Sequence, residues 1–262
     1  MGRSTKIFAL IFMVPALFFT AALRTDALPL RSITTVQWDY YLYDTPENGF
    51  RIEEAGIYRL DKLSLVAKAE WKDRPGFTEI KGMGGVVFNL FAYSYMETSY
   101  GVSKRWNEEN NEEAGENIIA HHLLADFYYE RESRLVIAGI KADLSPEEMS
   151  LQPSLAADWK ALPGFSLWGK YITSLSNKND FVHSFWGEGE YELSNTFTLN
   201  AGGTIGTYIP DMGESPELEY SGLGGLAFKP AENLTFSYGL EYKFRPDYNN
   251  IVSNTLTGDV RF

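Results

Sequence analysis

The chain of 262 residues contains no cysteine, so neither disulfide bonds nor thiolate metal sites support its fold, and no thiol can act as a nucleophile. It has only 3 histidines. His121 and His122 are consecutive, so on a strand they point to opposite faces, and the adjacent His183 and Ser184 cannot pair on one face. Partners of these histidines on neighbouring strands are not visible in the sequence. We therefore expect no catalytic residue, no metal site and no cofactor.

The chain has fewer basic than acidic residues, with 23 Lys and Arg against 35 Asp and Glu. Its formal net charge is -12 and its isoelectric point is about 4.8. This balance argues against a nucleic-acid partner and against attachment to an anionic surface through a basic patch.

Beyond its first residues, the sequence has no apolar run long enough for a transmembrane helix. The N-terminus joins the basic "MGRSTK" to the short apolar "IFALIFMVPALFF", which Pro15 interrupts. Small residues follow, so we predict a signal peptide over residues 1–27, cleaved after Ala22 or Ala27, and a barrel domain over residues 28–262. An uncleaved N-terminal anchor is the alternative.

In the rest of the chain, apolar and polar residues alternate with a period of two. In "LTFSYGLEYKF", large apolar residues from Leu234 to Phe244 occupy one face and Thr235, Ser237 and Lys243 the other. The chain divides into about fourteen such segments, each close to the length of a tilted membrane strand. Twelve or sixteen strands are alternatives. We predict strands at 33–43, 50–60, 63–72, 78–88, 92–106, 118–130, 134–144, 150–161, 165–175, 181–193, 196–209, 218–228, 234–244 and 251–262.

Some of these strands are irregular. Glu53 and Glu54 are consecutive acids in the second strand, which predicts a β-bulge there. The fourth strand places Met83 on the polar face, and the twelfth places Leu223 there.

The connections between the predicted strands alternate between long and short. "DTPENG", "KDRPGF" and "NEENNEEAGEN" are long, whereas "DK", "NLF", "ES", "LPG", "SN" and "PAEN" are short. A membrane barrel has tight turns at one end and longer loops at the other. The fold class predicted is therefore all-β, a transmembrane antiparallel up-and-down β-barrel. Aromatic residues at strand ends, such as Tyr129, Trp159 and Phe236 near short turns, indicate an interfacial girdle.

The last residues, "TLTGDVRF", resemble the C-terminal assembly signal of Gram-negative outer-membrane β-barrel proteins, the porin-like channels among them. Thr255 matches its polar start, Val260 and Phe262 match its apolar residue and terminal aromatic, and Gly258 lies one place later than the usual glycine. The resemblance implies a bacterial outer-membrane location, insertion by the barrel assembly machinery, and contact with outer-membrane lipid and lipopolysaccharide. It does not resolve a subfamily.

The inward face of the predicted barrel carries many charges. The pore-lining candidates are Lys68, Glu70, Lys81, Asp126, Lys141, Asp158, Lys170, Glu188, Glu190, Glu241 and Lys243. These charges either line a water-filled lumen as rings that select ions, or pair into a salt-bridged plug. We predict passive diffusion of small hydrophilic solutes or ions, with a mild cation preference from the acidic run at Glu188 and Glu190. The alternatives are a structural or surface-interaction barrel with an occluded lumen and, third, an outer-membrane lipid-modifying enzyme or protease.

Overall fold

The computed structural model describes residues 30–42, 47–107, 118–146, 148–177, 181–208, 217–246 and 250–262. These residues form one closed antiparallel barrel of 14 strands, which confirms the predicted fold class and strand number. The strands are β1 (Leu30–Tyr41), β2 (Glu47–Arg59), β3 (Leu63–Arg74), β4 (Phe77–Phe91), β5 (Ser94–Asn107), β6 (Ile118–Arg131), β7 (Arg134–Leu144), β8 (Met149–Leu162), β9 (Phe165–Ser176), β10 (Val182–Glu192), β11 (Phe197–Tyr208), β12 (Glu217–Ala231), β13 (Leu234–Phe244) and β14 (Ile251–Arg261).

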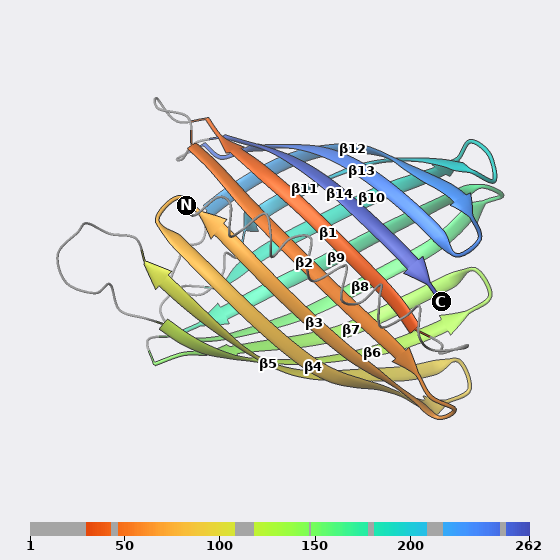
Figure 1. Ribbon diagram of the computed structural model, residues 1–262, viewed down its shortest axis with the longest axis horizontal. Coiled ribbons are helices and arrows are strands. Elements are labelled where there is room, and N and C mark those ends of the chain that lie inside the picture. The colour runs from red at the N-terminus through yellow and green to blue at the C-terminus, as the bar shows by residue number, and fades with distance from the viewer. Residues whose placement is uncertain are drawn as a thin grey trace, which may run out of the picture.

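Each strand pairs with its neighbours in the chain, and β14 pairs with β1 to close the sheet (Figure 1). The register of this closing pair is continuous from Arg31 opposite Arg261 to Tyr41 opposite Ile251. The Phe262 N–H donates to the Leu30 carbonyl at 2.8 Å, so the pairing extends to the last residue. Closure leaves no sheet edge in hydrocarbon, where unpaired backbone groups cost several kcal/mol each.

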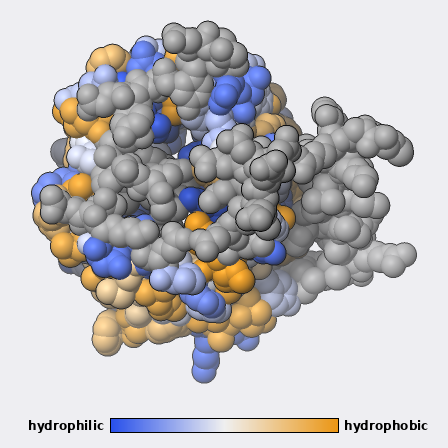
Figure 2. Space-filling model, turned by 90° about the vertical axis from the view of Figure 1, so that its left-hand side faces the viewer, coloured by the Kyte–Doolittle hydropathy of each residue, from blue (hydrophilic) through white to orange (hydrophobic). Residues whose placement is uncertain are grey.

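Alternation along the strands separates an apolar outer wall from a polar inner wall. In β13, Phe236, Tyr238 and Leu240 are exposed on the outside, and the pairing register places Glu241 and Lys243 on the inside. The view onto the loop-bearing end of the barrel shows hydrophobic residues over much of the outer edge, with hydrophilic residues between them (Figure 2). The large exposed hydrophobic side chains therefore face the surroundings of the barrel, not a central core.

One end of the barrel, here called the short-turn rim, carries the connections that follow β2, β4, β6, β8, β10 and β12. The opposite end is called the loop rim. At the short-turn rim, Tyr93 and Glu132 adopt φ values of 66° and 55°. Two predicted turns were misplaced, because β4 continues through "NLF" to Phe91 and β12 continues into "PAEN" as far as Ala231.

The predicted bulge at Glu53 and Glu54 is wrong. The registers of β2 with β1 and with β3 are both unbroken, so the two carboxylates lie on opposite faces. Glu54 faces outward and accepts hydrogen bonds from the hydroxyls of Ser32 and Thr34, which supply the polar partners that a carboxylate on this face needs. Register shifts occur instead at the short-turn ends of β4–β5, β8–β9 and β12–β13.

Among the described residues, no helix is both long and apolar enough to cross a membrane. The predicted signal peptide over residues 1–27 lies outside the described residues, as does most of the "NEENNEEAGEN" connection.

Candidate functional site: the charged lumen

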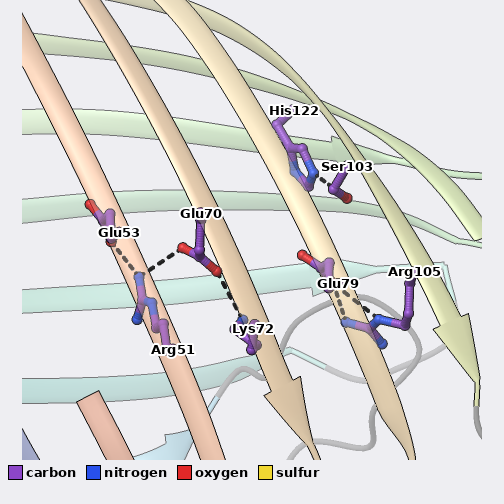
Figure 3. Close-up of polar contacts among 8 residues, drawn as sticks. All are labelled: Arg51, Glu53, Glu70, Lys72, Glu79, Ser103, Arg105 and His122. Atoms are coloured by element: carbon purple, nitrogen blue, oxygen red, sulfur yellow. Dashed lines mark hydrogen bonds and ion pairs between the residues drawn. The ribbon is translucent and has the colours of Figure 1, made fainter. Parts of the chain in front are cut away.

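The inner wall of β2 and β3 carries a chain of ion pairs (Figure 3). The Arg51 guanidinium lies 2.6 Å from Glu53 and 2.9 Å from Glu70. Lys72 extends the chain, with its Nζ 3.3 Å from the second oxygen of Glu70. The register places Glu53 directly opposite Glu70, and Arg51 neutralises the repulsion between these two carboxylates.

The wall continues across β4 and β5. Arg105 donates to Glu79 from Nε and Nη2 at 3.0 and 2.9 Å, and its guanidinium lies 4.2 Å from the centre of the Phe77 ring. Lys68 on β3 reaches over β4 to Glu97 on β5 at 3.5 Å. Gly85 lies on the strand between them, where a Cβ would stand 2.1 Å from the Ser99 hydroxyl oxygen. Because Gly85 has no side chain, the inner surface of β4 leaves room for the Ser99 hydroxyl and for the Lys68–Glu97 pair that crosses it.

On β5, β6 and β7, three side chains form a relay that the sequence could not show. His122 Nδ1 lies 2.6 Å from Asp143, and its Nε2 lies 2.9 Å from the Ser103 hydroxyl. Asp143 also pairs with Lys141 at 2.7 Å. This is the order of nucleophile, base and orienting acid found in serine hydrolases.

The surroundings of this relay do not fit an active site. Ser103, His122 and Asp143 are 4%, 5% and 2% exposed. The cavity that they line with Glu79 and Arg105 has a volume of about 10 Å³, room for a single water molecule and not for an acyl group. The relay therefore acts as a buried polar link between three strands.

On the other side of the closing seam, the charges are again paired. Glu219 is 2% exposed as a side chain and meets Arg245 at 2.8 Å and Lys243 at 3.8 Å. Arg31 binds Asp259 through two hydrogen bonds of 2.9 and 2.7 Å, which join β1 to β14 on the inside of the barrel.

The wall formed by β8, β9 and β10 differs. Asp158, Glu188 and Glu190 face inward, and among the described residues none of them forms an ion pair with a lysine or arginine. Glu188 accepts a hydrogen bond from the Asn200 amide at 2.6 Å, and Oδ1 of Asp158 is buried without a donor. The charges that act on Glu190 come from Glu188, Asp158 and Glu192, all of them negative.

Two lysines also face inward on these strands, Lys160 on β8 and Lys170 on β9. Lys170 on β9 acts electrostatically on Asp126 of β6, as does Lys68 of β3. In the ring of 14 strands, β9 lies directly opposite β2. The lumen therefore has a neutralised wall around β2–β5 that faces an acidic wall at β8–β10.

A cavity of about 270 Å³ lies on the inside near the closing seam. Its lining joins the hydroxyls of Thr198, Thr235 and Thr257 to the charged Arg31 and Glu190. The cavity is open because small polar side chains line it, whereas long charged side chains fill the lumen beside β2–β5.

All of the charged residues predicted to line the lumen take inward positions. The structure pairs Lys68, Glu70, Lys141, Glu241 and Lys243 with opposite charges. Asp158, Glu188 and Glu190 gather without a cation, and Lys81 lies opposite Glu70 in the register. Sequence reasoning missed the Ser103–His122–Asp143 relay and the inward pair Trp168 and Trp186, whose rings meet edge to face at 5.4 Å.

Among the described residues, no group of three or more His, Asp or Glu is arranged to hold a metal ion. The residues of the predicted assembly signal all lie on β14 or directly after it. Thr255 faces inward, and Gly258, Val260 and Phe262 face outward.

No protein-family model matches this sequence, and no curated protein matches it. Solved structures match its fold. The P. putida toluene transporter TodX is 6% identical, with a TM-score of 0.65 over 90% of this chain and 91% of that one. The monoaromatic hydrocarbon channel CymD is 7% identical, with a TM-score of 0.60 over 90% and 89%. A bacterial polysaccharide outer membrane secretin is 11% identical, with a TM-score of 0.54 over 90% and 100%.

At these identities the likeness concerns the fold alone. The closed antiparallel barrel of this chain resembles in fold the channels of the bacterial outer membrane. The chain has the fold of a porin-like outer-membrane β-barrel.

Proposed function

We propose that this protein is an outer-membrane pore through which small hydrophilic solutes and ions diffuse passively, with a mild preference for cations. The observation that carries the proposal is the acidic wall of Asp158, Glu188 and Glu190, which lacks basic partners and faces a wall of neutralised charge. Unpaired carboxylates along a pore raise the local cation concentration and lower that of anions.

The outward aromatic residues and the closed sheet support a location in the outer membrane, with the short-turn rim toward the periplasm. The last eight residues then act as the signal that the barrel assembly machinery reads. TodX is described as a toluene transporter and CymD as a monoaromatic hydrocarbon channel. The lumen of this chain is lined by charges and hydroxyls, which favours hydrophilic solutes instead.

Recording from planar bilayers tests the proposal. Purified, folded protein is expected to produce discrete conductance steps in potassium chloride, with a permeability ratio that favours potassium. Protein that shows heat-modifiable mobility on a gel, and is therefore folded, but gives no steps would refute the pore.

The second candidate is a structural or surface-interaction barrel with an occluded lumen. The observation that favours it is the set of buried ion pairs, in which Glu79, Arg105, Asp143 and Glu219 are between 2% and 6% exposed. Shortening the connection over residues 108–117 separates the two candidates. If the protein is a pore, the shortened variant should show altered gating. If the barrel is occluded, neither the wild type nor the variant should conduct, and the variant should show altered ligand binding.

We also propose that the chain is not an enzyme. The support is the lack of substrate space beside Ser103, the member of the relay that would act as the nucleophile. The similar structures CymD, TodX and the secretin are described as a channel, a transporter and a secretin, and not as hydrolases.

A further inference from the structure

Four residues on the outer wall of β5 and β6 form a patch near the loop rim. Tyr100, Lys104 and Trp106 alternate along β5, and His121 lies on β6 directly opposite Val102. We call these four residues the Lys104–His121 patch. Lys104 is the only lysine or arginine on an outward position in the loop-rim half of the described strands.

Contacts within the patch hold the His121 ring and the Lys104 ammonium group on one surface. The Tyr100 hydroxyl lies 2.7 Å from His121 Nδ1, and the two rings are stacked with their centres 6.1 Å apart. The Lys104 ammonium lies 5.1 Å from the centre of the Trp106 ring. Lys104 pairs with Ile119, so it is a diagonal neighbour of His121, a relation that spans about 7–8 Å.

The tautomer of His121 depends on whether the Tyr100 hydroxyl donates to Nδ1 or accepts from it. When the Tyr100 hydroxyl donates to Nδ1, the proton of the neutral ring is on Nε2. Among the described residues, no side chain accepts from Nε2. In this tautomer the patch presents an N–H donor and an ammonium group, both suited to a phosphate oxygen.

The surroundings of the patch are apolar. On the same face, Ile80, Val102, Ile119 and Leu123 are between 40% and 51% exposed. The carboxylate of Asp73 also faces outward, but it is on β3, two strands away from Trp106, and accepts a hydrogen bond from Thr78 at 2.9 Å. A ligand for this surface combines an anionic group at the level of Lys104 with hydrocarbon below it.

A second tyrosine–histidine pair provides a comparison within the chain. Tyr171 on β9 and His183 on β10 meet at 2.6 Å, also on the outer wall. The ring of Phe181, and not a lysine, lies against His183, with the ring centres 4.4 Å apart. The two pairs share one geometry and differ in the presence of a cation.

We propose that the Lys104–His121 patch binds the phosphate of a glycolipid in the outer leaflet of the membrane. Lys104 supplies the charge, His121 Nε2 supplies a directed donor, and Trp106 and Tyr100 hold these groups at the membrane interface. The inference rests on the proposed outer-membrane location with the loop rim outward. It does not depend on whether the lumen conducts.

Binding of bisphosphorylated lipid A to the mature protein in detergent tests the inference, measured by native mass spectrometry beside the dephosphorylated glycolipid. We expect the phosphorylated form to bind more tightly, and Lys104→Gln and His121→Gln each to weaken that binding by about fivefold to tenfold. Lys104→Arg should retain it, and the matched variant His183→Gln should leave it unchanged.

Three results would overturn the inference: equal binding of the dephosphorylated glycolipid, unchanged binding by Lys104→Gln, or displacement by an equal concentration of inorganic phosphate. The last would mean that the patch takes a free anion instead of a lipid. Heat-modifiable mobility shows that each variant is folded, and conductance measured on the same samples reports separately on the proposed pore.

Discussion

Removal of the acidic wall gives the sharpest test of how this barrel selects ions. The variant combines Asp158→Asn, Glu188→Gln and Glu190→Gln, which keeps the shape of the wall and removes its charge. We expect the preference for potassium over chloride to disappear, because other lumen carboxylates such as Glu70, Glu79 and Glu219 are paired with arginines.

The size of the effect follows from screened electrostatics. An ion about 8 Å from a carboxylate in water gains or loses about 0.5 kcal/mol, and a Debye length of about 10 Å at 0.1 M salt reduces this to about 0.2 kcal/mol. Three such carboxylates favour a cation by about 0.7 kcal/mol and disfavour an anion equally, a ratio of about tenfold. At 1 M salt the Debye length is about 3 Å, and the same sum gives a ratio below about twofold.

The assay is the reversal potential across a planar bilayer under a salt gradient, first near 0.1 M and then near 1 M. The control variant, Lys68→Gln with Glu97→Gln, removes one ion pair and no net charge, so its permeability ratio should match that of the wild type. A conducting triple variant that keeps the wild-type ratio at 0.1 M would refute the reasoning, as would a wild-type ratio that salt does not change.

Three further outcomes are expected. Gly203→Ala should lower the free energy of unfolding by about 1–3 kcal/mol, because the new Cβ would stand 2.1 Å from a backbone carbonyl oxygen. Gly222 lies directly opposite and has nothing within 4 Å of a new Cβ, so Gly222→Ala should be nearly neutral. Urea unfolding in lipid measures both variants, and equal effects would contradict the steric argument. A fluorophosphonate probe should leave Ser103 unlabelled in the folded barrel, and labelling that is lost in His122→Asn would show a reactive serine instead. Deletion of Phe262 should reduce the heat-modifiable fraction recovered from outer membranes. The closing seam would lose its last hydrogen bond, and the predicted signal would lose its aromatic end. Recovery equal to that of the wild type would argue against the signal.

The sequence was sufficient for the number of strands and for the face on which each charge lies. On a membrane strand every side chain faces either lipid or lumen, so a period of two assigns the faces directly. Glu188, Glu190 and Lys243 lie where this rule places them. The rule led to an error at Glu54, where an outward carboxylate was attributed to a bulge although hydroxyls from β1 support it.

The partners of these charges could not be predicted, because they depend on the register between strands. His122 is 19 residues from Ser103 and 21 from Asp143. A shift of one residue in either pairing would place the three side chains on different faces. Likewise, only the structure shows that Lys170 acts on Asp126 and leaves Glu190 among negative charges.

The seam between β1 and β14 has a consequence for folding. Its Arg31–Asp259 contact joins residues 228 positions apart, and closing a loop of that length costs on the order of 5 kcal/mol in chain entropy. Until that contact forms, both end strands remain as unpaired edges, so a partly zipped barrel is poorly tolerated in hydrocarbon. Every other strand pair joins neighbours in the chain, so closure of this seam is the costly step, and a weakened strand anywhere lowers the population of the closed cylinder.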